Sequence, residues 1–301
     1  MGLFKKKKEE KIIFKQLNGD YFKYRYEYLK SISKKTAKAF LKDSSELMGA
    51  GYKKSAFLIK FKGDVTISNI NLFREKITAL LNIASSGDVC IFSIESGGGT
   101  VTSYGELSYE LSRIKKAGIT LITTVDQIAA SGGYMLAVQG DKIYAAPNAV
   151  LGSIGVIVSM PNYSKVLEKI GVKYHNYMAG KNKRPLTPYN EPTKEGEEHI
   201  QIELEKVHEM FKETVKNCRP EILDNIEKIS EGDTFFGEEA LNLKMIDGFT
   251  TTNEIVFDLI NDEYLVTEIK SNNPQKKTII NKFVSATADE IEKRIKTHFS
   301  L

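Results

Sequence analysis

The chain has 301 residues, of which 41% are hydrophobic and 27% charged, and its formal net charge is +4. This composition is typical of a globular protein with one large domain or two small ones, and it excludes collagen-like, wholly disordered and disulfide-scaffold chains. Cys90 and Cys218 have no second cysteine or histidine at zinc-ligand spacing. We therefore expect neither a metal nor a cofactor.

Charge is distributed unevenly along the chain. Residues 1–54 hold 15 Lys and Arg against 6 Asp and Glu, a local charge of +9, whereas the remaining residues total −5. A basic arm interleaved with aromatic residues is able to bind an anionic membrane surface or, less expectedly, nucleic acid, but it is also typical of a solvated, partly helical surface arm.

Neither a spanning helix nor a signal peptide is expected. No stretch approaches the roughly 18 apolar residues of a spanning helix, and the lysines at positions 5–8 are followed by Glu9 and Glu10 rather than by an apolar core. We expect a protein that is cytoplasmic or peripheral at the inner membrane.

From residue 55 the pattern alternates short apolar strands with amphipathic helices. Strands are predicted at residues 56–62, 89–94, 120–125, 142–145 and 154–159, and the intervening helices carry apolar stripes at Phe73, Ile77, Leu80, Leu81 and at Leu107, Leu111, Ile114. Repeated strand and helix units predict an α/β domain over residues 55–262. It would be flanked by the basic N-terminal region, 1–54, and by a polar C-terminal tail, 263–301, that ends in a charged helix at 289–296.

A long amphipathic helix follows residue 193. Its apolar positions are Ile202, Val207, Met210, Phe211 and Val215, and it ends before Pro220. Such a helix is more typical of a lid or an oligomerisation element than of a catalytic segment.

Two glycine-rich turns each follow a buried strand and open a helix. Residues 97–99 (GGG) form the first, and Ser131 followed by Gly132 and Gly133 forms the second. Backbone N–H groups at a helix start can bind an anion or an oxyanion, although plain tight turns have the same composition. Neither nucleotide-binding glycine signature is present.

Ser131 is a candidate nucleophile, but a serine that only caps the helix would occupy the same place. A serine nucleophile needs a base, and His175, His199, His208 and His298 lack the surroundings of a triad histidine. Lysine can replace histidine if its pKa is lowered, and candidates lie in residues 178–184.

Five ordered motifs resemble the signal peptide peptidase family of Ser-Lys serine peptidases (peptidase family S49), most closely its SohB-like branch. They are residues 95–99 (ESGGG), residues 129–134 (AASGGY) preceded by Asp126, residues 141–143 (DKI), residues 152–156 (GSIGV) and residues 180–184 (GKNKR). The resemblance covers residues 56–253, about two thirds of the chain.

The resemblance implies a serine endopeptidase with Ser131 as nucleophile, Lys183 as general base and an oxyanion hole made from Gly98, Gly99 and Gly132. Gly97 stands where the family usually has proline. The resemblance also implies a Clp/crotonase-like spiral of β-β-α units and a ring- or bowl-shaped homo-oligomer in which some relatives pair serine and lysine across subunits. Its substrates would be signal peptides, membrane-protein fragments or misfolded chains.

Two other interpretations stay open. A crotonase-type acyl-CoA enzyme would share the fold and the glycine-rich oxyanion donors, but it would leave Ser131 and Lys183 without a role. A non-catalytic, peptidase-like scaffold would bind chains without cutting them, and it would have no need for either residue.

Overall fold

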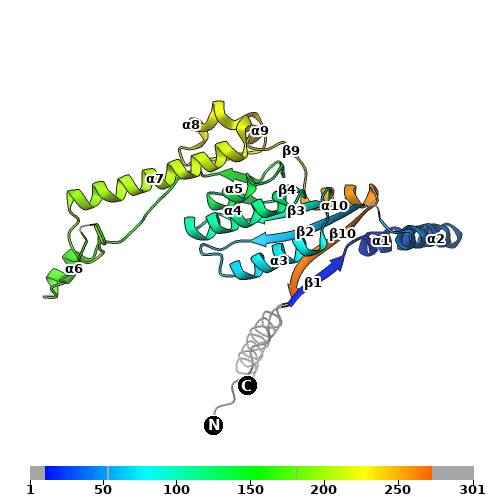
Figure 1. Cartoon of the computed structure of the whole chain (residues 1–301), viewed down its shortest axis with the longest axis horizontal. Coiled ribbons are helices and arrows are strands. Elements are labelled where there is room, and N and C mark those ends of the chain that lie inside the picture. The colour runs from blue at the N-terminus through cyan, green and yellow to red at the C-terminus, as the bar shows by residue number, and fades with distance from the viewer. Residues whose placement is uncertain (1–10, 53, 181, 273–301) are drawn as a thin grey trace, which may run out of the picture.

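Two β-sheets and the helices around them make up the computed structural model, which describes residues 11–52, 54–180 and 182–272 (Figure 1). The strands are β1 (Lys11–Gln16), β2 (Lys54–Lys62), β3 (Val89–Glu95), β4 (Thr120–Val125), β5 (Ile128–Ala130), β6 (Lys142–Ala145), β7 (Val150–Gly152), β8 (Thr234–Phe236), β9 (Gly248–Phe249) and β10 (Tyr264–Asn272). The helices are α1 (Asn18–Ile32), α2 (Lys34–Ala50), α3 (Ile70–Ile83), α4 (Val101–Lys116), α5 (Gly132–Ala137), α6 (Ser164–Lys169), α7 (Lys194–Cys218), the 3₁₀ turn η1 (Pro220–Asn225), α8 (Ile226–Ile229), α9 (Gly237–Asn242) and α10 (Thr252–Asn261).

The larger sheet has seven strands in the order β1-β10-β2-β3-β4-β6-β9, and the smaller has three in the order β5-β7-β8. All pairs in the larger sheet are parallel except β1 with β10. The strands predicted at 56–62, 89–94, 120–125 and 142–145 are confirmed as β2, β3, β4 and β6. Their nearly continuous apolar sequences suit parallel strands that are covered on both faces.

Successive side chains of β2 point to opposite faces of the sheet, as strand geometry requires. Phe57, Ile59 and Phe61 belong to the main core with α3 and α4, whereas Ala56 and Leu58 pack with α10 in a second cluster. The sheet is therefore covered by helices from both sides, and the predicted α/β class is confirmed.

Repeated β-β-α units are visible in the chain order. Strands β4 and β5 are followed by α5, and β6 and β7 are followed by α6. In the unit before them, the second strand is reduced to one residue. Ser96, which lies between β3 and α4, forms an isolated parallel bridge to Ala129 of β5. The second strand of each unit thus leaves the large sheet and joins a small layer beside it, and the nucleophile candidate Ser131 follows this layer directly.

Two segments differ from the prediction. Residues 264–272, predicted to lie in a polar tail, form β10 between β1 and β2, because Val266 and Ile269 are fully buried in the clusters on opposite faces of the sheet. Residues 154–159, predicted to be a strand, have no regular structure because the chain leaves the small sheet after Gly152.

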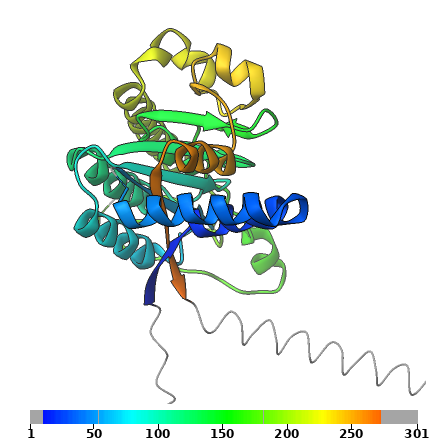
Figure 2. The ribbon, with the colours of Figure 1, turned by 90° about the vertical axis from the view of Figure 1, so that its right-hand side faces the viewer.

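The basic N-terminal region contributes β1 at the sheet edge and a hairpin of α1 and α2, which lie side by side in both views (Figures 1 and 2). Leu17, Tyr21 and Phe22 pack this region against the α10 cluster. The lysines at 5–8 and the predicted helix at 289–296 lie outside the described residues.

Candidate active site

Ser131 stands at a sharp turn between β5 and α5. Its backbone angles, φ +51° and ψ −122°, lie in a region that non-glycine residues rarely occupy. The turn is held from both sides, since the Ser131 N–H donates to the Gly152 carbonyl over 2.7 Å and the Ser131 carbonyl accepts the N–H groups of Tyr134 and Met135. A strained conformation fixed in this way presents the side chain in one direction.

The side chain of Ser131 does not cap α5. No side-chain cap hydrogen bond is formed at this helix start, so the capping interpretation is wrong. The residue is partly exposed, and it lines the cavity described below. Its hydroxyl is therefore placed to meet a ligand rather than to satisfy the backbone.

Gly98 brings the other glycine-rich turn against Ser131. Its φ is +93°, and a Cβ there would lie 2.6 Å from the Ser131 Cβ and 2.8 Å from the Gly132 nitrogen. Only glycine fits this approach without moving the serine turn. Gly132 is equally confined, because a Cβ on it would lie 2.5 Å from the ring of buried Tyr104.

A chain of hydrogen bonds fixes the Gly98 turn. The Gly98 N–H donates to Ser96 Oγ over 3.1 Å, Ser96 Oγ lies 2.6 Å from the Tyr104 hydroxyl, and that hydroxyl donates to the Asp64 carbonyl over 2.9 Å. Of the three expected oxyanion donors, Gly98 is thus engaged. No hydrogen bond from the N–H of Gly99 or Gly132 to another described residue is present.

A cavity of about 710 Å³ opens in front of Ser131. Its wall is mainly apolar, and it is built by the α4 start, the α5 start, the segment after β7, and α7. The lining residues are Val65, Gly99, Thr100, Val101, Thr102, Tyr104, Gly105, Ser131, Gly132, Met135, Gly155, Val156, Ile157, Val158, Ile200, Glu203, Leu204, Val207, Met210, Phe211 and Thr214. This size and lining suit a peptide side chain or a short apolar segment.

Lys183 lies in the loop between α6 and α7, away from this cavity. It is exposed, and neither it nor any of the three described histidines is among the lining residues. His298 lies outside the described residues. Within one chain, the structure brings Ser131, Gly98, Gly99 and Gly132 together and does not bring Lys183 to them. No group of three or more His, Cys, Asp or Glu that could hold a metal occurs in the described part of the chain.

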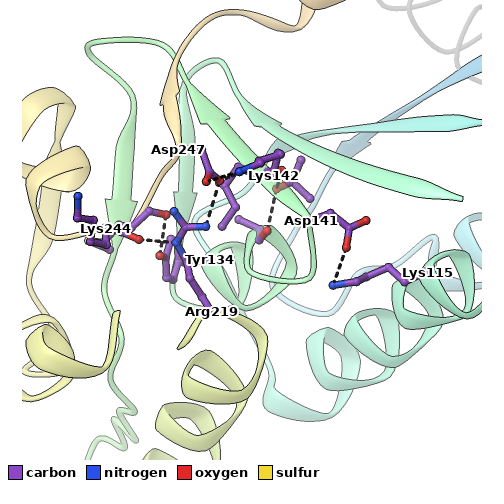
Figure 3. A network of polar contacts seen from close by, with 11 residues as sticks. Lys115, Tyr134, Asp141, Lys142, Arg219, Lys244 and Asp247 are labelled. Carbon is purple, nitrogen blue, oxygen red and sulfur yellow. Dashed lines mark hydrogen bonds and ion pairs between the residues drawn. The ribbon is translucent and has the colours of Figure 1, made fainter. Parts of the chain in front are cut away.

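A polar network behind the site ties α5 to the C-terminal end of α7 (Figure 3). The Tyr134 hydroxyl donates to the Met245 carbonyl over 3.0 Å. Arg219, which follows α7, donates to the Lys244 carbonyl and forms a 3.1 Å ion pair with Asp247.

Asp247 is the acidic centre of this network, and it also accepts the Ile143 N–H over 2.8 Å and lies 3.3 Å from the Lys142 amine. Burial raises the pKa of the Asp247 carboxyl, but the Ile143 N–H and the Arg219 charge outweigh burial and hold this pKa below its usual range. Since β6, α5 and the end of α7 meet here, the network positions the serine turn and the cavity wall relative to each other.

The α7 wall of the cavity was not foreseen as part of the site. Of the predicted apolar positions, Val207, Met210 and Phe211 line the cavity, whereas Ile202 is 49% exposed and does not. Ile200 and Leu204, which were not predicted, extend the apolar lining along the helix. Ile200, Leu204, Val207 and Phe211 have the spacing i, i+4, i+7, i+11 of a helix face, but the sequence pattern does not say that this face lines a cavity beside Ser131.

Two family models match this chain, and both belong to one family. The model of peptidase family S49 matches residues 113–263, and the model of the S49 N-terminal region matches residues 3–110. A probable protease SohB of Haemophilus influenzae is 39% identical over 231 residues, which are 77% of this chain and 64% of the relative. A probable protease SohB of Buchnera aphidicola (subsp. Schlechtendalia chinensis) is 38% identical over 239 residues, covering 76% of this chain and 78% of the relative.

Among solved structures, a variant of the 1510-N membrane-bound stomatin-specific protease in complex with a substrate peptide covers 68% of this chain and 80% of its own, with 19% identity and a TM-score of 0.43. No helix in the part of the chain that the structure describes is long and apolar enough to span a bilayer.

Proposed function

The chain belongs to peptidase family S49, and on that premise we propose that it is a serine endopeptidase with Ser131 as nucleophile and Lys183 as general base. The observation that carries the proposal is the Ser131 turn, which is strained, uncapped and open to the cavity. Strain of this kind concentrates at functional sites, because the surrounding structure must hold it in place.

The reaction follows from these positions. A neutral Lys183 amine takes the proton of the Ser131 hydroxyl as its oxygen attacks the peptide carbonyl, and the protonated amine then gives a proton to the leaving amine. Water hydrolyses the resulting ester in the same manner. The N–H groups of Gly99 and Gly132 bind the oxyanion, and each donor contributes about 3 kcal/mol to transition-state stabilisation.

Lys183 reaches Ser131 from a neighbouring copy of the chain in this proposal. Lys183 is exposed and lies off the cavity of its own chain. The loop that carries it, between α6 and α7, also exposes large apolar side chains, with Ile170 at 67% and Tyr177 at 91% exposure. Such a surface is typical of a protein contact, so the active form is a homo-oligomer, of the ring or bowl type, in which each site is shared.

The test is hydrolysis of casein or of a fluorogenic peptide by wild type, Ser131→Ala and Lys183→Ala between pH 6 and 10. We expect both variants to fold and assemble but to lose activity, and the rising limb of the wild-type profile to report the apparent pKa of the base. Cleavage that persists in Ser131→Ala would show that the nucleophile is another residue. A wild type that cuts nothing would favour the scaffold, and acyl-CoA turnover would favour the crotonase-type enzyme.

Co-expression of the two inactive variants separates a shared site from one within a single chain. In randomly mixed oligomers with shared sites, about a quarter of the sites combine an intact serine with an intact lysine, whereas none does if both come from one chain. Recovery of about a quarter of wild-type activity is therefore expected, and recovery of none would refute the sharing.

The α1–α2 hairpin and β1 are proposed to contact an anionic membrane surface. Residues 11–44 hold nine basic and three acidic side chains, and Tyr24, Tyr28 and Ile32 lie exposed along one side of α1. Aromatic and basic side chains together favour an anionic lipid interface. Sedimentation with phosphatidylserine-containing vesicles should be lost in high salt or in a Lys34→Gln/Lys35→Gln/Lys38→Gln variant. Equal binding to neutral vesicles would contradict the proposed contact with an anionic membrane surface. Nothing in the structure would then favour substrates that lie near a membrane.

A further inference from the structure

The apolar cavity in front of Ser131 carries one charged side chain among its lining residues, the carboxylate of Glu203 on α7. The neighbouring lining positions on the same helix are Ile200, Leu204 and Val207. A lone carboxylate at the edge of an apolar wall attracts a cation and repels an anion, so it discriminates between ligands by charge even where it adds little affinity.

Glu203 is available to a ligand. Within the described residues its ion-pair partner is Lys206, one turn along the helix, at 2.7 Å, and both side chains are about half exposed. The hydrogen bond and charge of Lys206 lower the pKa of the Glu203 carboxyl, so the group is ionised at neutral pH. Exposed pairs at this helical spacing are weak and exchange readily, and Lys206 itself does not line the cavity.

The position of Glu203 on α7 sets its distance from Phe211, at the end of the cavity that packs on the domain. The C-terminal half of α7 packs on the domain, where Phe211 and Met135 share the main core, whereas its N-terminal half extends beyond α4 and α5 (Figure 1). Eight residues of helix separate Glu203 from Phe211, which is about 12 Å at 1.5 Å per residue. An extended peptide covers that length in about four residues.

We propose that Glu203 is a specificity-determining residue that accepts a lysine or arginine side chain of a bound peptide, about four residues from the residue held beside Met135 and Phe211, while apolar residues between them fill the cavity. The inference rests on the proposed peptidase function, because it names the substrate class of the same site. The preferred substrates would be extended peptides in which a basic residue lies next to a run of apolar residues.

The probes are fluorescein-labelled 12-residue peptides with a leucine and alanine host sequence, in which one lysine, glutamine or glutamate is scanned along the chain. Cleavage by wild type gives kcat and KM for each peptide. We expect the lysine peptide to have a KM about threefold below that of the glutamine peptide at one or two adjacent positions, as a half-exposed charge pair allows, with little change in kcat.

Three variants identify the carboxylate. Glu203→Gln should abolish the preference for lysine, and Glu203→Lys should transfer it to the glutamate peptide. Lys206→Gln should strengthen the preference for lysine, because it removes the competing cation, and a merely structural role of Glu203 would not produce this. Glu205→Gln is the matched control: it removes the same charge from the same turn, but Glu205 does not line the cavity.

Binding to the inactive Ser131→Ala protein, measured by fluorescence anisotropy, separates the inference from the proposed function. Equal affinity of Ser131→Ala for the lysine, glutamine and glutamate peptides at every position would overturn the role of Glu203, even if wild type cleaves them all. Conversely, charge-selective binding that depends on Glu203 supports the inference even if no peptide is cut.

Discussion

The substitution Gly98→Ala tests the geometry on which the site depends. A new Cβ would meet the Ser131 Cβ at 2.6 Å, the Ala130 carbonyl at 2.8 Å and the Gly132 nitrogen at 2.8 Å. Two of these contacts are backbone atoms of the serine turn, so no flexible side chain can move aside. The left-handed backbone angle of residue 98, φ +93°, adds a further penalty for alanine.

The expected magnitude follows from these two contributions. Placing a non-glycine residue in left-handed backbone costs about 1–2 kcal/mol, and overpacking costs about 1–3 kcal/mol, so the free energy of unfolding should fall by about 2–5 kcal/mol. Because the relief of the clash displaces Ser131 and Gly132, peptidase activity should fall by about 100-fold or more, mainly in kcat.

Gly97→Ala is the matched control. Nothing lies within 4 Å of a Cβ at that position, and residue 97 has no left-handed φ. Urea unfolding followed by far-ultraviolet circular dichroism should place Gly97→Ala within about 1 kcal/mol of wild type, with activity retained. If Gly98→Ala matches Gly97→Ala in both stability and kcat, the close approach of the two turns is wrong, and the proposed arrangement of nucleophile and oxyanion donors fails with it.

Two further substitutions test the parts that support the site. Asp247→Asn removes the acidic centre of the network behind α5, and because Asp247 keeps a lowered pKa in the folded state, its stabilisation is present above the unfolded pKa of about 3.9 and is lost as the pH falls through the folded value. We expect a loss of about 1–3 kcal/mol at pH 7 that shrinks in acid, and a pH-independent loss in urea unfolding would contradict this role. Gly97→Pro should raise the free energy of unfolding by about 0.5–1 kcal/mol. Space is open around residue 97, its φ is not left-handed, and the preceding Ser96 is in an extended bridge, as a residue before proline prefers. A destabilised variant with reduced activity would show that the turn needs the conformational freedom of glycine.

The sequence predicts most of the α/β domain because its strands are apolar and bounded by turn residues. Strands β4 and β6 were predicted with the bounds that the structure has. β10 was missed because Thr267, Glu268 and Lys270 mask the two buried positions, Val266 and Ile269. A strand that contributes only single residues to each core cluster has no strong alternation, and its neighbours in the sheet come from both ends of the chain.

The site is predictable in part for a related reason. Ser131 and its glycines are close in sequence, and their turn shows as small residues between a strand and a helix. The cavity is not local, since Val65, Val101 and Leu204 meet only through the fold. The placement of Lys183 could not be read from the sequence either, because the distance between two loops depends on the path of the chain and on any second copy.

The two parts of the proposed site, the Ser131 turn (the nucleophile half) and the Lys183 loop (the base half), differ in how many contacts within one chain fix their positions. The nucleophile half is supported within one chain by the buried Ser96–Tyr104 hydrogen bond, by the glycine contacts and by the Asp247 network. The base half, with Lys183, lies on an exposed loop that also carries the exposed apolar side chains of Ile170, Val172 and Tyr177. Since the strained Ser131 turn is held within a single chain, the proposed oligomer would need to supply only the lysine. The proposed shared site would therefore couple association between copies to catalysis, because the same exposed loop carries the proposed base and the proposed contact surface.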